Sequence, residues 1–462
     1  MAEPVSPSVP PPSRSAGGKH RRSRGAHRAR RAGGRREAVA AVVTQAVTAG
    51  CSFLLQIVAA HRLGVAGLGG YALCVALLVT ATALYTGWVG DSLTVLDRQQ
   101  PRIRPALVAS ALTAWLVSAV VGVGVVLLLG VGSTETALIF AALVVAWLAE
   151  ETGRRLLMAR LEMWSLVLND VTYAVATLLA LVVLTRTGTR LTLGTLLGAM
   201  GIGAVAAVLM AVLQLPRAEW GTLRPGIRGL PELSSFAAWR SLQATLRPAS
   251  LLLVRVLVAN LTSLAVVGLL EAARLVLAPA QTVINGAGNF LLPSFAVAER
   301  WGTGIGRHLA ERAVRVLVVV TVLVGLLAAA FRAPLGNLLT GGGIPLSAAC
   351  IVGWAAYLAT WAATLPFVAE LVARRRSRDV FVARLVDSVV GLTLAAGALI
   401  LGASYAVIPW LLSVGGVVAA WWVRRLALQT RGPAAASSPG PRAGGQPAGE
   451  GHPGRASTLP AA

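Results

Sequence analysis

The fold is decided by the stretch AVAAVVTQAVTAGCSFLLQIVAAHRLGVAGLGGYALCVALLVTATALYTGWVG, residues 38–90. It holds two apolar runs, 38–60 and 68–90, separated by a short turn. Each run has the ~17 to 25 residues that a helix needs to cross ~30 Å of hydrocarbon. The stretch therefore predicts two consecutive transmembrane helices.

The same pattern continues through most of the chain. Of its 462 residues, 56% are hydrophobic and only 13% are charged, whereas a soluble domain carries about 25% charged residues. We predict an all-α polytopic membrane protein with about twelve transmembrane helices. The ten further predicted spans are 105–130, 136–153, 165–185, 191–215, 237–259, 263–291, 312–331, 345–369, 380–401 and 405–423. Pro279 predicts a kink in the eighth span.

Two segments rich in Pro, Gly and other small or basic residues flank the spans. Residues 1–37 and 425–462 are expected to be disordered cytoplasmic tails, because neither holds apolar residues at a useful period. Between them we expect a first six-helix bundle at 38–215, a cytoplasmic linker at 216–236 and a second bundle at 237–424.

The formal net charge of +23 comes almost entirely from arginines in short clusters between the apolar runs. This distribution does not predict nucleic-acid binding, which needs one basic domain or face. The cysteines Cys51, Cys74 and Cys350 lie inside apolar runs and form neither a disulfide framework nor a metal-ligand cluster. We therefore expect no bound metal, no cofactor and no catalytic residue.

Arginines also predict the orientation of the chain. With the N-terminal tail inside, the inner loops hold seventeen arginines, counted together with Arg312 and Arg315 at the start of the ninth span, and the outer loops hold four. The positive-inside rule then places both termini in the cytoplasm. We expect a multi-pass protein of the cytoplasmic membrane.

The two halves of the chain share a weak repeat. The run LGVAGLGGYAL (Leu63–Leu73) follows the first predicted span, and TSLAVVGLLEAA (Thr262–Ala273) follows the seventh. Aligning Gly69 with Gly268 places both glycines at the start of the second helix of a six-span half. Duplicated six-helix halves are a recurring plan in secondary transporters.

These two runs, with NFLLPSFA (Asn289–Ala296) in the eighth span, resemble the MOP superfamily. They look most like its polysaccharide-exporter branch, which flips lipid-linked oligosaccharides. The resemblance covers nearly everything between the tails. It departs at GWVGDS, where Asp91 follows Gly90, whereas many members have an acidic residue just before a glycine. The resemblance implies two pseudo-symmetric six-helix bundles around a central cavity.

Polar side chains follow one face of three predicted spans, as expected for helices that line a water-filled cavity. Arginine can fork onto phosphate oxygens, and hydroxyls and amides suit a saccharide. The predicted substrate-binding residues are Arg255, Arg247, Arg274, Glu271, Asn285, Gln281, Gln45 and Gln56.

Each of these residues also has a structural interpretation. Arg247 and its neighbour Arg240 could extend to the inner headgroups. Glu271 and Arg274, three residues apart, could form a packing ion pair. Arg255 lies too deep to reach the inner headgroups easily, although the outer headgroups are nearer.

Two further charged positions carry open alternatives. Asp170 could bind a coupling ion, or it could be a helix-start carboxylate near cytoplasmic arginines. Arg384 and Asp387, three residues apart in the eleventh span, are predicted to form a structural pair.

The predicted function is a flippase that moves a lipid-linked oligosaccharide or polysaccharide precursor across the membrane for cell-surface polysaccharide assembly. We expect a monomer that contacts membrane lipids, with a polysaccharide polymerase and glycosyltransferases as partner enzymes, and we do not expect an enzyme.

Three alternatives remain open. A drug/cation antiporter of the same fold would favour acidic cavities. A major-facilitator transporter would have glycines around Asp97-Arg98, where this chain has LTVLDRQQPRIR. A membrane-embedded glycosyltransferase would need a substantial outer loop or carboxylates near an interface.

The orientation can be tested by labelling single cysteines in a version from which Cys51, Cys74 and Cys350 have been removed. Cysteines at positions 133 and 261 should react with an impermeant maleimide added outside intact cells, and cysteines at 100 and 375 should not. Reversed labelling at either pair would refute the twelve-span topology.

Overall fold

The computed structural model describes residues 19–96, 100–220, 224–300, 307–374 and 376–429, all of whose regular structure is helical. The long helices of the first half are α1 (Lys19–Arg62), α2 (Gly64–Tyr85), α4 (Ile103–Leu128), α5 (Thr134–Ala159), α6 (Met163–Arg186) and α7 (Leu193–Gln214). Those of the second half are α9 (Leu230–Leu261), α10 (Leu264–Leu275), α11 (Ala278–Arg300), α12 (Arg307–Ala330), α14 (Ala348–Ala373), α15 (Ser377–Ile400) and α16 (Ile408–Gln429). The short elements are the π-helical turn η1 (Thr86–Gly90), α3 (Asp91–Val95), α8 (Arg217–Trp220), α13 (Arg332–Thr340) and the 3-10 turn η2 (Tyr405–Val407).

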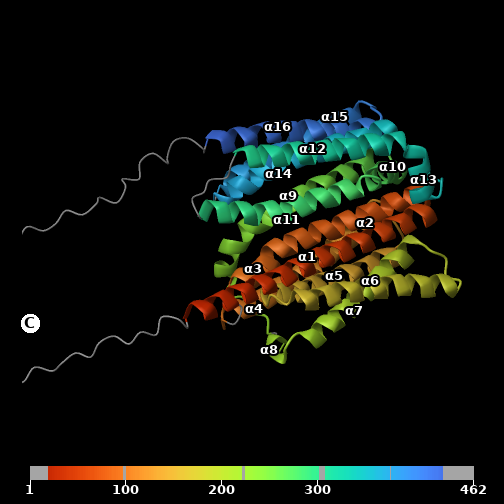
Figure 1. Ribbon diagram of the computed structural model, residues 1–462. Helices are drawn as coiled ribbons and strands as arrows, with labels where there is room; N and C mark the ends of the chain where they lie inside the picture. Colours follow the sequence, from red (N-terminus) through yellow and green to blue (C-terminus); the bar gives the residue numbers. More distant parts are fainter. Residues whose placement is uncertain (1–18, 97–99, 221–223, 301–306, 375, 430–462) are drawn as a thin grey trace, which may run out of the picture.

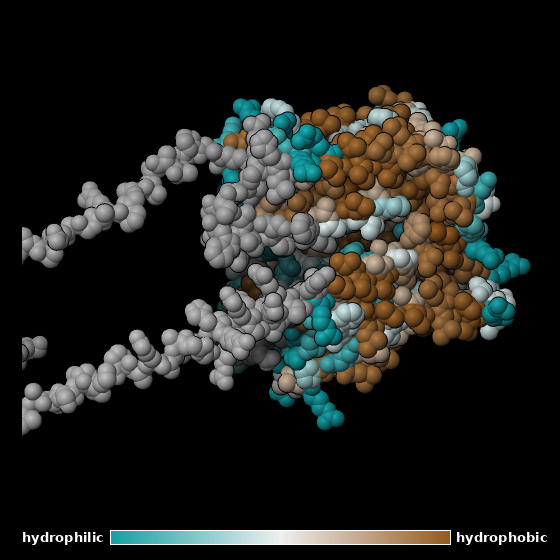
Figure 2. All heavy atoms as spheres, viewed as in Figure 1, coloured by the Kyte–Doolittle hydropathy of each residue, from teal (hydrophilic) through white to brown (hydrophobic). Residues whose placement is uncertain are grey.

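Within the described residues, eleven helices are long and apolar enough to cross a membrane, and the bent pair α10–α11 makes up to twelve. The two helices of this pair meet at 64°. Their break falls at residues 276–277, just before Pro279, which confirms the predicted kink. Apolar side chains cover the flanks of the bundle in Figure 2, and hydrophilic ones gather toward its ends. This is the surface that a bilayer requires.

Several helices extend beyond the predicted spans. α1 begins at Lys19, so residues 19–37 are helical rather than part of a disordered tail, while residues 1–18 lie outside the described chain. α9 takes over the predicted linker from Leu230, and α16 continues to Gln429. Arginine, alanine and leucine are good helix formers, so a helix need not stop where its apolar run stops. α1 begins and α16 ends at the same end of the bundle (Figure 1), as an even number of crossings requires.

The two halves repeat one packing scheme. In the first half α5 packs on α4 and α7, and α6 packs on α1 and α7. In the second half α14 packs on α12 and α16, and α15 packs on α9 and α16. These pairs correspond span by span, which gives the internal symmetry that the sequence repeat predicted. Figure 1 shows the halves as two groups of helices.

The halves cross most tightly at the repeated glycines. Gly69 on α2 and Gly268 on α10 are both buried where these helices meet. A Cβ on Gly69 would lie 1.9 Å from the carbonyl oxygen of Leu264, and one on Gly268 would lie 1.9 Å from that of Val65. Only glycine allows the two backbones to approach so closely.

A second crossing joins α2 and its continuation to α9. A Cβ on Gly87 would lie 2.4 Å from Cα of Ser241. Arg240 lies beside this contact and donates to Asp91 at 2.7 Å, so it is ion-paired across the halves. Gly286 lies eighteen residues after Gly268, as Gly87 does after Gly69, yet a Cβ there would meet nothing within 4 Å. The symmetry between the halves is therefore broken at this end of the bundle.

This comparison predicts opposite effects of adding one methyl group at two related glycines. Gly69→Ala should destabilise the protein by about 1–3 kcal/mol or more, because the added Cβ overlaps a backbone carbonyl. Gly286→Ala should leave stability unchanged or raise it, since alanine is the better helix former. Thermal unfolding of both purified variants in one detergent measures the difference. Equal unfolding temperatures for Gly69→Ala and wild type would contradict the close crossing.

Candidate functional site

Four of the predicted site residues meet between α9, α10 and α11. Arg255 on α9 donates to Glu271 on α10 at 2.9 Å. Arg274 also donates to Glu271, and it donates to Gln281 on α11 at 3.0 Å. We call these four residues the α9–α11 cluster.

The cluster forms because the chain folds back at residues 262–263 and bends again after Leu275. Glu271 and Arg274 form the ion pair that the structural interpretation describes. Arg255 joins the same carboxylate, and its side chain is only 13% exposed. Its guanidinium is therefore held inside the protein. One carboxylate serves two guanidinium groups, so the α9–α11 cluster carries a surplus positive charge.

The other predicted residues lie apart from this cluster. Asn285 lies on α11, about one turn beyond Gln281, and is half-buried. Gln45, which is exposed, and Gln56, which is half-buried, lie on α1 in the other half. Among the described residues, no hydrogen bond joins these three amides to the α9–α11 cluster.

Arg247 occupies a separate cavity inside the second half. Its guanidinium stacks on the ring of Trp361, 3.3 Å from the ring centroid, and lies 5.8 Å from that of Tyr357. Arg247 is thus held against aromatic residues of the bundle interior rather than extended to the headgroups, contrary to the headgroup interpretation. The cavity, here called the Arg247 chamber, has a volume of about 50 Å³ and a wall made by α9, α14, α15 and α16.

Arg384 and Asp387 both line the Arg247 chamber. Among the described residues, they form no direct ion pair, so the predicted structural pair is not present. Asp387 instead lies within electrostatic range of both Arg247 and Arg384. A wider cavity of about 330 Å³ adjoins the chamber and shares Arg384 and Val368 with it.

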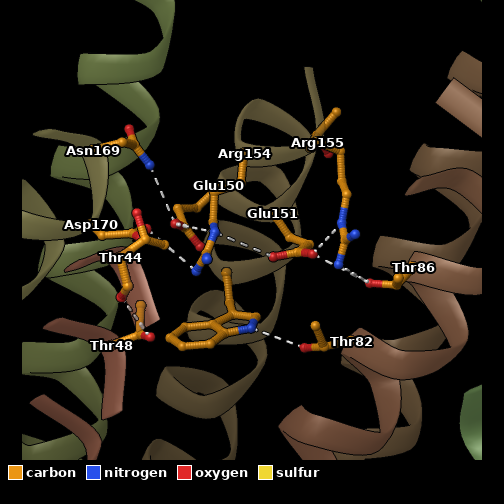
Figure 3. A network of polar contacts seen from close by, with 12 residues as sticks. Thr44, Thr48, Thr82, Thr86, Glu150, Glu151, Arg154, Arg155, Asn169 and Asp170 are labelled. Carbon is orange, nitrogen blue, oxygen red and sulfur yellow. Dashed lines mark hydrogen bonds and ion pairs between the residues drawn. The ribbon is translucent and has the colours of Figure 1, made fainter. Parts of the chain in front are cut away.

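The first half holds a buried polar network that the sequence analysis did not assemble (Figure 3). On α5, Arg155 donates to Glu151 at 2.7 Å and to Thr86 at 3.1 Å. Arg154 lies 3.4 Å from Asp170 on α6, and its Nε lies 3.9 Å from Glu150. We call this arrangement the α5–α6 network.

Asp170 is the least satisfied member of the α5–α6 network. It is 1% exposed, and neither carboxylate oxygen accepts a hydrogen bond. The neighbouring Asn169 donates to Glu150 at 3.3 Å, while its own carbonyl oxygen and the hydroxyl of Thr44 are also buried without a partner. Arg154 balances Asp170 only in part, because it also lies close to Glu150 and Glu151.

The network was missed because the fourth span was predicted to end at 153. α5 continues to Ala159, so Arg154 and Arg155 are helical and partly buried rather than loop residues. Without these two, the count of inner arginines is still fifteen against four. The signal was the spacing: each glutamate lies four residues before an arginine, as ion pairs on a helix do.

The geometry matches solved transporters although the sequence does not. No protein-family model and no curated protein sequence matches the chain. An inward-facing multidrug-resistance MATE family transporter of the MOP superfamily is 13% identical, with a TM-score of 0.63. That match covers 86% of this chain and 99% of the transporter. The lipid II flippase MurJ, in an inward closed conformation, is 11% identical with a TM-score of 0.67 over 85% of this chain and 87% of MurJ. An outward-facing MATE transporter has a TM-score of 0.54 at 12% identity, over 84% of this chain and 94% of that one.

The chain has the MOP fold. This confirms an all-α polytopic membrane protein with two helical halves, and it sets aside the major-facilitator alternative. At 11–13% identity the likeness extends to the fold and not to the cargo.

Proposed function

We propose that the protein is a flippase that moves a lipid-linked oligosaccharide or polysaccharide precursor across the cytoplasmic membrane. The observation that carries this proposal is the positive surplus inside the second half. Arg255 and Arg274 share the single carboxylate of Glu271. Arg247 and Arg384 line one cavity with a single carboxylate, that of Asp387, which is not directly ion-paired to either. An anionic cargo is the chemistry that such an interior favours.

The cost of charge in a membrane explains why the surplus matters. A guanidinium at mid-membrane costs ~2.5 to 3.5 kcal/mol on insertion scales. A chain that keeps four of them in one half, with two carboxylates to balance them, favours an anion that completes the pairing. The pyrophosphate of a lipid-linked glycan supplies such an anion, and planar guanidinium groups fork onto phosphate oxygens. The amides of Gln281, Asn285, Gln45 and Gln56 suit sugar hydroxyls. MurJ, which shares the fold, is a lipid II flippase, so this fold is compatible with a lipid-linked cargo.

Asp170 is proposed as the coupling residue. Its buried oxygens accept no hydrogen bond, so a proton or a small cation would satisfy them. When a proton or cation binds Asp170, the guanidinium of Arg154, 3.4 Å away, would lose part of the negative charge that balances it. Cation binding in the first half would thus change the charge of the α5–α6 network. The polymerase and glycosyltransferase partners and the monomeric state belong to the same proposal.

The α5–α6 network favours one competing function. Its three carboxylates exceed its two guanidinium groups, and an acidic interior suits a drug/cation antiporter. The MATE transporters that share the fold are multidrug-resistance proteins. The two functions differ in the sign of the charge on the cargo. Substitutions of the arginines in the second half therefore discriminate between them.

The flippase proposal predicts how Arg255 variants restore surface glycan in a host that lacks this protein. Arg255→Ala should reduce export by about tenfold or more, because a charge-assisted contact to phosphate is lost. Export by Arg255→Lys should lie between that of wild type and that of Arg255→Ala, since lysine keeps the charge and loses the planar fork. Arg274→Ala should behave like Arg255→Ala, and Glu271→Gln should lose less.

The matched control is Arg190→Ala, in an exposed loop that is predicted to lie outside, and it should export normally. The amount of each variant in the membrane is measured alongside. Full export by normally abundant Arg255→Ala would refute the substrate-binding role, and equal loss in Glu271→Gln and Arg274→Ala would indicate a purely structural ion pair.

A further inference from the structure

The Arg247 chamber differs from the other buried charge clusters in how its cations are paired. Arg255, Arg274, Arg154 and Arg155 each donate to or lie against a carboxylate. In the part of the chain that the structure describes, neither Arg247 nor Arg384 makes a hydrogen bond or a direct ion pair. Two guanidinium groups therefore face one small cavity with their N–H donors unused.

The contact with Trp361 leaves those donors available. The Trp361 ring lies 3.3 Å from the guanidinium carbon of Arg247, so it covers one face of the group. A guanidinium stacked in this way keeps its N–H bonds in its own plane, at the edge, where they can fork onto an oxyanion. Trp361 thus fixes the plane of the cation without using its hydrogen bonds.

The remaining wall is mixed, with polar groups set among leucine, valine and alanine side chains. Ser250 donates to Ser388 at 2.7 Å across the cavity wall, which joins α9 to α15. Asp387 is the single carboxylate in the wall and lies in range of both guanidinium groups. Because it neutralises one charge, the chamber keeps one positive charge for a ligand.

The size of the chamber limits what can enter it. A water molecule needs roughly 10–15 Å³ of such space, whereas a cavity that holds benzene measures about 150 Å³. At about 50 Å³ the chamber has room for a compact oxyanion and not for a sugar ring. The adjoining cavity of about 330 Å³ shares Arg384 and could take the larger part of a molecule.

We propose that the Arg247 chamber is a phosphoryl-binding site, in which Arg247 and Arg384 bind one phosphate group between them. The phosphate could belong to the transported lipid pyrophosphate or to free inorganic phosphate. The assignment to the lipid rests on the proposed function, whereas the chemistry of the site does not.

The test measures binding to the purified full-length protein in detergent by isothermal titration calorimetry. Inorganic phosphate, pyrophosphate and a polyprenyl pyrophosphate are the three probes. At least one should bind wild type, and Arg384→Gln and Arg247→Gln should each weaken that binding by about tenfold or more. Arg378→Gln is the matched control, because Arg378 is exposed on the same helix as Arg384 and lies outside the chamber wall. It should bind like wild type.

Arg247→Lys tests the site even if Arg247→Gln does not fold. Lysine keeps the positive charge but loses the planar fork, so this variant should still bind phosphate more weakly. Competition by polyprenyl pyrophosphate supports the lipid as the source, and binding of phosphate alone supports a free anion. No binding by wild type, or unchanged binding in both Arg384→Gln and Arg247→Lys, overturns the proposal. Glycan export measured on the same variants distinguishes the phosphoryl-site proposal from the flippase proposal. Normal export with no phosphate bound would refute the phosphoryl site alone. Absence of export by wild type would refute the flippase proposal.

Discussion

The structure depends on the requirement that a charge inside hydrocarbon must be balanced within the protein, because no bulk water reaches it. The two halves meet this requirement differently. In the first half, Glu150, Glu151 and Asp170 outnumber Arg154 and Arg155. In the second half guanidinium groups outnumber carboxylates in both the α9–α11 cluster and the Arg247 chamber. One fold, repeated twice, thus carries opposite charge in its two interiors.

This opposition connects the fold to a mechanism. The halves touch tightly along α2, at Gly69 against α10 and at Gly87 against α9, while Gly286 faces open space. Under the proposed function, the cationic interior would hold the cargo and the acidic interior the coupling ion, and the crossings along α2 would connect the two.

Much of the fold could be predicted because membrane crossing needs only length and apolarity. The predicted spans follow from this, the kink follows from the proline at Pro279, and the repeat of Gly69 and Gly268 follows from the need for close backbone contact. The functional site was harder to predict than the fold. Arg240, Arg247 and Arg255 all belong to the predicted seventh span, yet the structure gives them three different partners: Asp91, Trp361 and Glu271. The helical period predicts on which side of a helix a side chain lies. Its contact partner depends on which other helix packs against that side. The α5–α6 network could not be predicted, because the predicted fourth span ends at 153 and excludes Arg154 and Arg155.

The most direct measurement is transport by the purified protein in proteoliposomes that hold a fluorescent saccharide on a polyprenyl pyrophosphate. Accessibility of the fluorophore to impermeant dithionite reports movement between leaflets, and uptake of a fluorescent organic cation is followed in parallel. We expect the protein to move the pyrophosphate lipid and to leave the organic cation outside. Transport of the cation with no movement of the lipid would contradict it and would favour a drug/cation antiporter.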